Sequence, residues 1–120
     1  MAKIGRSVKD YLLHLADWIE KVRLVEHAIA QSGDIGNQIN ELALSRALEV
    51  TGEICGRLTA EFPEWAIEKR DFGLDDAYRL RNKIIHGYDT LDTRLLLVIA
   101  REYIPQLQNK LTEWLAEENV

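Results

Sequence analysis

Residues 48–58 read LEVTGEICGRL and lie in an apolar pattern of helical period that predicts a helix from about Gln38 to Phe62. Pro63 disfavours continuation of that helix. Gly52 and Gly56 stand four residues apart inside it, and each costs about 1 kcal/mol relative to alanine in a helix interior. Because a missing side chain lets another helix approach closely, the two glycines predict a tightly packed neighbour, which we expect to be the next long helix. The inward stripe of this segment is Leu44, Leu48, Val50, Ile54, Leu58 and Phe62.

A second long helix is predicted before this segment. Ser7 and Asp10 have the Ser-x-x-acid form of a helix start, and the helix should run to about Gln31, where residues 32–37, SGDIGN, favour a turn. Its apolar residues recur at three- and four-residue steps: Val8, Leu12, Leu15, Ile19, Val22 and Ile29.

The second half of the chain predicts two more long helices. Residues 63–73 lack a clear period and predict a connecting loop or a short helical turn. A helix should then begin near Asp75 as its cap and end near Gly87, with Leu80 and Ile84 pointing inward. The last helix should begin near Asp92, with Pro105 forcing a kink or a break, and bury Leu95, Val98, Ile99, Leu107, Leu111 and Trp114. The fold class is therefore all-α, an antiparallel bundle of four long helices, or five if Pro105 splits the last.

Composition indicates a single folded domain, residues 1–120, because 47% of the residues are hydrophobic and 29% are charged. A formal charge of −5 argues against indiscriminate binding to nucleic acid. The single cysteine, Cys55, excludes an internal disulfide and a cysteine-based metal site. The longest apolar run, residues 95–100, is too short to span a bilayer, so a cytoplasmic protein is expected.

Residues 81–88 read RNKIIHGY and gather the groups best equipped for chemistry. Arg81 offers a fork of N–H donors that matches phosphate oxygens, and His86 can exchange a proton near neutral pH. In an ideal helix five residues turn through about 500°, so Arg81 and His86 would point roughly 140° apart. Either the helix loosens at Gly87, or two chains pack so that both pairs line one cleft.

This string resembles the Arg-x4-His-x-Tyr motif of the HEPN proteins, in particular of the HepT-like toxins encoded beside a minimal nucleotidyltransferase antitoxin. Three features that flank the string are also similar to features of that family: the Gly-Glu pair at residues 52 and 53, Asp92, and residues 104–107, IPQL. The resemblance covers roughly residues 10–115.

The resemblance implies a HEPN-like bundle and a metal-independent endoribonuclease toxin of a type VII-like toxin–antitoxin system, without a cofactor, whose composite site lies at a homodimer interface. His86 would act as general base on the ribose 2′-OH or as acid on the leaving oxygen, and Arg81 would stabilise the phosphate charge. Asn82 would orient the phosphate or His86, and Glu53 would hold the Arg81 guanidinium. Tyr88 would receive AMP from an MntA-like antitoxin, which would add negative charge beside the RNA cleft.

Two other readings stay open. The chain could be a non-catalytic helical module that docks or regulates a nucleotidyltransferase and holds a nucleotide with its basic motif, or a structural dimer whose motif is inactive. His14 and His27 lack a second residue at metal-ligand spacing and predict packing or surface positions.

Overall fold

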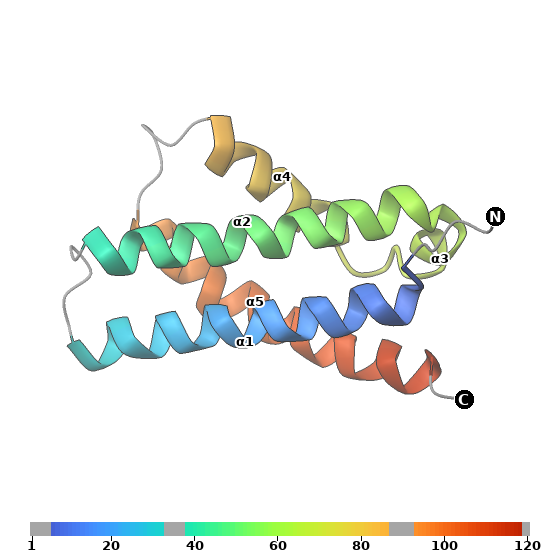
Figure 1. Ribbon diagram of the computed structural model, residues 1–120, viewed down its shortest axis with the longest axis horizontal. Helices are drawn as coiled ribbons and strands as arrows, with labels where there is room; N and C mark the ends of the chain where they lie inside the picture. Colours follow the sequence, from blue (N-terminus) through green and yellow to red (C-terminus); the bar gives the residue numbers. More distant parts are fainter. Residues whose placement is uncertain (1–5, 33–37, 87–92, 119–120) are drawn as a thin grey trace.

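The computed structural model describes residues 6–32, 38–86 and 93–118, and of His86 it describes only the backbone. Helices make up the whole architecture of this part of the chain (Figure 1). The all-α prediction is confirmed. The helices in chain order are α1 (Val8–Ser32), α2 (Gln38–Glu61), α3 (Pro63–Glu68), α4 (Leu74–His86) and α5 (Thr93–Glu118).

The start of α1 is the capping box predicted from the sequence. The backbone N–H of Asp10 donates to Ser7 Oγ at 3.1 Å, and the backbone N–H of Ser7 donates to Asp10 Oδ2 at 2.9 Å. The hydrogen bond from the Ser7 backbone, and after it one with the Ser7 side chain, favours the charged carboxylate and lowers the pKa of Asp10.

The seam between α2 and α4 is built on the two glycines. A Cβ on Gly52 would lie 2.3 Å from the carbonyl oxygen of Ala77 and 2.6 Å from Cβ of Arg81. A Cβ on Gly56 would lie 2.2 Å from Cδ1 of Tyr78. The expected close neighbour is therefore α4, the helix that carries the motif, and at Gly52 a larger residue would collide with the backbone of that helix.

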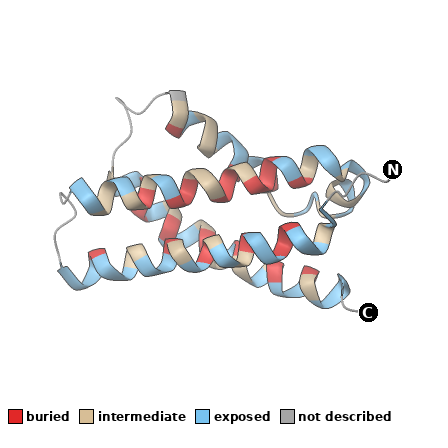
Figure 2. Ribbon diagram, viewed as in Figure 1, coloured by how far each residue is buried: buried red, intermediate tan, exposed pale blue. Residues whose placement is uncertain are grey.

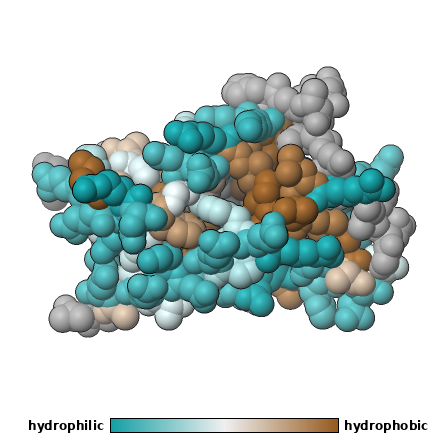
Figure 3. Space-filling view, turned by 180° about the vertical axis from the view of Figure 1, so that it is seen from behind, coloured by the Kyte–Doolittle hydropathy of each residue, from teal (hydrophilic) through white to brown (hydrophobic). Residues whose placement is uncertain are grey.

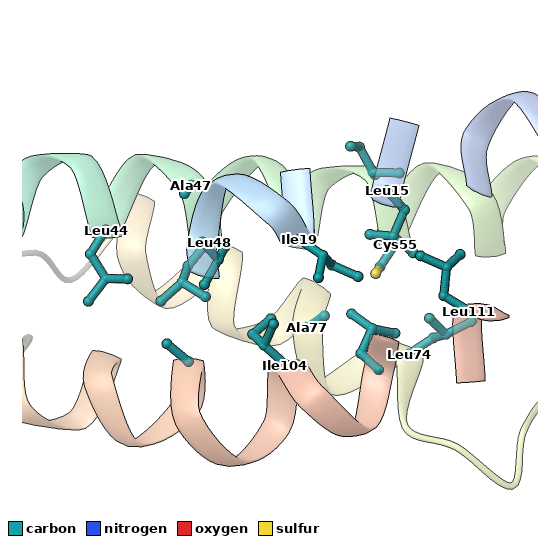
Figure 4. Close-up of a cluster of buried hydrophobic side chains, with 14 of the residues drawn as sticks. Leu15, Ile19, Leu44, Ala47, Leu48, Cys55, Leu74, Ala77, Ile104 and Leu111 are labelled. Carbon is teal, nitrogen blue, oxygen red and sulfur yellow. The ribbon is translucent and has the colours of Figure 1, made fainter. Parts of the chain in front are cut away.

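The core joins α1, α2, α4 and α5 in one cluster of buried side chains (Figures 2 and 4). Figure 4 shows Ile19 of α1, Cys55 of α2, Ala77 of α4 and Ile104 of α5 converging on it. Thr51 is the one buried polar residue among the described residues. Its hydroxyl donates a hydrogen bond to the carbonyl oxygen of Ala47 at 2.8 Å. That bond satisfies the hydroxyl inside α2, so the core contains no isolated polar group at this point.

The last helix does not break at Pro105, which was one of the two outcomes predicted there. α5 continues through this residue as one helix, and the fifth helix is instead α3, within the segment predicted as a loop or short turn. Pro105 removes one backbone donor, but Ile104 and Leu107 on either side are buried in the core, and their packing holds the helix together. The predicted cap was wrong: α4 begins at Leu74, so Asp75 lies in its first turn and does not precede the helix.

The inward face of α5 was also predicted wrongly in part. Leu95 and Val98 are 52% and 48% exposed, whereas Leu96, Leu97 and Ala100 are buried. Residues 95–100 are uniformly apolar, so periodicity alone could not choose which face of α5 meets the core. Two large apolar side chains are consequently left on the surface.

Cys55 is expected to be unreactive in the folded protein. It is fully buried, and burial raises the pKa of its thiol from 9.0 to about 12, which lowers the thiolate fraction by about a thousandfold at a given pH. Labelling with a thiol reagent at mildly alkaline pH should therefore be very slow in native protein and fast in guanidinium chloride. Rapid stoichiometric labelling of the native protein would contradict this core position.

Candidate functional site

Arg81 lies on the face of α4 that meets α2. Its side chain begins directly over Gly52 and is partly buried, and its guanidinium reaches the next residue of α2, Glu53. Arg81 Nε lies 2.8 Å from Glu53 Oε2, and Arg81 Nη1 donates to Asn82 Oδ1 at 2.9 Å. The Nε–H is buried and is not aimed at an acceptor among the described residues, so the contact with Glu53 is an ion pair without hydrogen-bond alignment. These contacts fix the guanidinium and leave Nη2 without a partner in the described part of the chain.

Glu53 pairs with two arginines. Its Oε1 accepts a hydrogen bond from Arg57 Nε at 3.1 Å, while its Oε2 faces Arg81. The Glu53 carboxylate, and after it the hydroxyl of Tyr11, raises the pKa of Arg57. Two guanidiniums around one carboxylate leave the cluster with one net positive charge, which suits a site for an anionic ligand.

Tyr78 is a third neighbour of Arg81, which the sequence analysis did not single out. Its ring lies 5.9 Å from Arg81 Cζ, one helical turn earlier on α4, and it sits over Gly56. The signal that could have found it is the pairing of two spacings: Tyr78 precedes Arg81 by three residues, and Gly56 follows Gly52 by four.

His86 is the last residue of α4, one and a half turns beyond Arg81. Its side chain, and all of Gly87, Tyr88 and Asp92, lie outside the described residues. The convergence of Arg81 and His86 on one cleft, and the modification of Tyr88, therefore stay predictions.

A match to a known family covers most of these elements. The model of the family described as "Ribonuclease HepT-like" matches residues 15–114, a range that extends from α1 to α5 and includes Glu53, Arg81 and Asn82. The chain belongs to the HepT-like ribonuclease family. It is also 31% identical over 105 residues to a protein of Thermococcus cleftensis named "Probable ribonuclease HepT", an alignment that covers 88% of this chain and 93% of the relative. No solved structure matches the chain.

In this HepT-like ribonuclease the structure brings together three of the five predicted site residues: Arg81, Asn82 and Glu53. The family resemblance inferred from the sequence is confirmed, while the role of each site residue is taken up below as a proposal. Among the described residues, no three His, Cys, Asp or Glu side chains gather in a way that could hold a metal ion. None of the described helices has the length and apolar character needed to cross a bilayer.

Another side of α4 borders a groove toward α5 in this HepT-like chain. The groove has a volume of about 420 Å³. Its floor is apolar and its rim on α4 is charged, and its lining residues are Asp76, Ala77, Arg79, Leu80, Lys83, Leu95, Ile99 and Tyr103. On the face turned away in Figure 1, apolar surface gathers in one area with hydrophilic surface around it (Figure 3).

Proposed function

We propose that this HepT-like chain is a metal-independent endoribonuclease toxin of a type VII-like toxin–antitoxin pair. The observation that carries the proposal is the placement of Arg81 between Glu53 and Asn82, on the helix that ends at His86, in a chain of a ribonuclease family. A fixed guanidinium next to a residue that can exchange protons is the minimum equipment for cleaving RNA.

The reaction needs no added nucleophile, because the ribose 2′-OH already lies beside the phosphate. His86 of one subunit takes the 2′-OH proton while the 2′-oxygen attacks phosphorus, and the bond from phosphorus to the 5′-oxygen breaks. His86 of the second subunit gives a proton to that leaving oxygen, so the products are a 2′,3′-cyclic phosphate and a free 5′-OH. Arg81 neutralises the charge that gathers on the phosphate oxygens, Asn82 orients the phosphate, and Glu53 holds Arg81.

This sequence of steps requires two copies of the chain. We assign the second copy to the face of α5 that exposes Leu95 and Val98, next to the groove along α4. A symmetric pair would bury this patch twice, and fully burying each large apolar side chain is worth roughly 1.5–3 kcal/mol. The same arrangement would bring the motif-bearing helices of both subunits to one interface.

The double variant Leu95→Asp/Val98→Asp is expected to be monomeric and inactive, because four carboxylates would have to enter an apolar interface. Light scattering after size-exclusion chromatography measures the mass, and a cleavage assay measures the activity. Leu24→Asp is the matched control, since Leu24 is an exposed leucine of α1 on no proposed interface. A wild-type protein that is monomeric but fully active would contradict the composite site.

Cleavage of RNA in the presence of EDTA tests the activity itself. Wild-type protein should cut an RNA oligonucleotide and leave a cyclic phosphate, and His86→Ala should cut it at least about a hundredfold more slowly. An oligonucleotide with 2′-deoxyribose throughout should stay intact. Absence of cleavage by the wild type, or equal rates in wild type and His86→Ala, would reject the enzymatic proposal. Binding of ATP or AMP without RNA turnover would then favour the docking module.

The proposed regulation acts on Tyr88. A minimal nucleotidyltransferase partner, MntA-like, would let the phenol oxygen attack the α-phosphate of ATP, with pyrophosphate leaving and AMP staying on the tyrosine. The added negative charge would repel RNA from the site. Mass spectrometry after co-expression with such a partner should show added AMP on wild type and none on Tyr88→Phe. A partner that neutralises the toxin while the Tyr88 peptide stays unmodified would reject this step.

A further inference from the structure

Tyr78 is exposed in a way that its packing does not explain. Tyr78 is 39% exposed, whereas every other aromatic residue among the described ones is buried or partly buried. Other aromatic rings, such as Phe72, Tyr103 and Trp114, pack against each other and against the core. Tyr78 has instead a cationic neighbour, Arg81, and a glycine beneath it.

Gly56 shows that this position is built for a ring. A glycine in a helix interior costs about 1 kcal/mol relative to alanine, and a methyl group at Gly56 would collide with Cδ1, Cε1 and Cγ of Tyr78. The ring thus packs on the seam between α2 and α4 over a glycine that costs helix stability, and 39% of the residue stays exposed. The exposed part of the ring is available to stack against a ligand.

Arg57 brings a second cation to this cluster, because it pairs with the same carboxylate as Arg81. It is 61% exposed on its side chain and shares the carboxylate of Glu53 with Arg81, so the two guanidiniums lie on the two oxygens of one carboxyl group. Glu53 neutralises only one of the two charges. The positive charge that remains is available to bind a phosphate of an RNA strand.

We propose that Tyr78 and Arg57 form a subsite for the nucleotide next to the one that is cut, with the base stacked on the Tyr78 ring and its phosphate bound by Arg57. The inference rests on the proposed ribonuclease function and specifies its substrate as single-stranded RNA. Aromatic stacking beside guanidinium groups is the usual way in which proteins hold single strands. Because every base has a stacking face, the subsite contributes affinity with little sequence preference.

The test measures binding to an RNA oligonucleotide that carries 2′-fluoro in place of every 2′-OH, which removes the nucleophile. Tyr78→Leu should weaken binding about tenfold, and Tyr78→Phe, which keeps the ring, less than about twofold. Arg57→Ala should weaken binding severalfold and lower the slope of log Kd against log salt by about one. The control is Arg101→Ala, because Arg101 is an exposed arginine that pairs with Glu26 at 2.6 Å on α5 and α1.

A fluorescent base analogue, 2-aminopurine, reports stacking directly. Its fluorescence should be quenched on binding to wild type and Tyr78→Phe, and not on binding to Tyr78→Leu. Thermal melts check that the variants fold, and Tyr78→Met replaces Tyr78→Leu if the latter unfolds.

The outcomes separate the two proposals. If wild type cuts ordinary RNA but Tyr78→Leu and Arg57→Ala bind the fluoro-oligonucleotide as Arg101→Ala does, the subsite is rejected and the ribonuclease stands. If binding depends on Tyr78 and Arg57 while wild type cuts nothing, the ribonuclease is rejected, and Tyr78 and Arg57 stand only as a site that binds single-stranded RNA. A wild type that does not bind the oligonucleotide rejects the subsite as well.

Discussion

Arg81→Ala is expected to lower kcat for RNA cleavage by about 10²–10³, the usual loss when one group that stabilises a developing oxyanion is removed. The substitution deletes the guanidinium that Glu53 and Asn82 hold in place. Arg81→Lys should recover part of the activity at most, because an ammonium keeps the charge but not the planar fork of donors.

The loss of activity should come without unfolding. Ion pairs near the surface contribute roughly 0–1 kcal/mol, and after the substitution Glu53 keeps its partner Arg57. Urea denaturation should therefore give nearly the same midpoint for Arg81→Ala and wild type. Arg101→Ala, which removes the ion pair with Glu26, serves as control and should cut RNA at the wild-type rate. Full activity of Arg81→Ala would remove this residue from the mechanism.

Gly52→Ala is expected to destabilise the protein by about 1–3 kcal/mol, the usual cost of overpacking a tight contact. Two effects compete at this position. Alanine favours the helix by about 1 kcal/mol, but its methyl group would lie 2.3 Å from a backbone oxygen of Ala77 and 2.6 Å from Cβ of Arg81. Backbone cannot rotate away, so α4 must shift as a whole, and the clash outweighs the gain in helix propensity.

The shift should also reduce cleavage, because Arg81 moves with α4 away from Glu53. Gly56→Ala is the matched comparison: its methyl group would meet the side chain of Tyr78, which can change rotamer, so the free energy of unfolding should fall by less. Urea denaturation and the cleavage assay measure both effects. If Gly52→Ala were more stable than wild type by about 1 kcal/mol, α2 and α4 would not be in tight contact at Gly52.

Much of the fold could be predicted from the sequence because the helices of this chain carry clear apolar periods and clear ends. The glycine pair predicted the α2–α4 seam for a physical reason, the absence of side chains. Prediction failed where the pattern was degenerate: Leu95 and Val98 lie in a run that is apolar on every face. At Pro105 the sequence left a kink or a break open, and the helix does not break, because packing outweighs one lost hydrogen bond.

The candidate site was less predictable. Arg81 and His86 stood out through a motif, and Glu53 and Asn82 through family resemblance. Arg57 gave no signal, because an arginine four residues after a glutamate is typical of any solvated helix surface. Tyr78 became notable only once the structure placed Gly56 beneath it.

The carboxylate of Glu53, held between two guanidiniums, has a consequence for how an acidic protein selects its ligand. Because it cancels one of the two charges at that place, the field that reaches into solvent is weak, and polyanions are not drawn in from afar. Selection between ligands then depends on short-range contacts. A single strand that contacts the guanidiniums and the Tyr78 ring together binds more tightly than a duplex or an acidic polymer that cannot make both contacts.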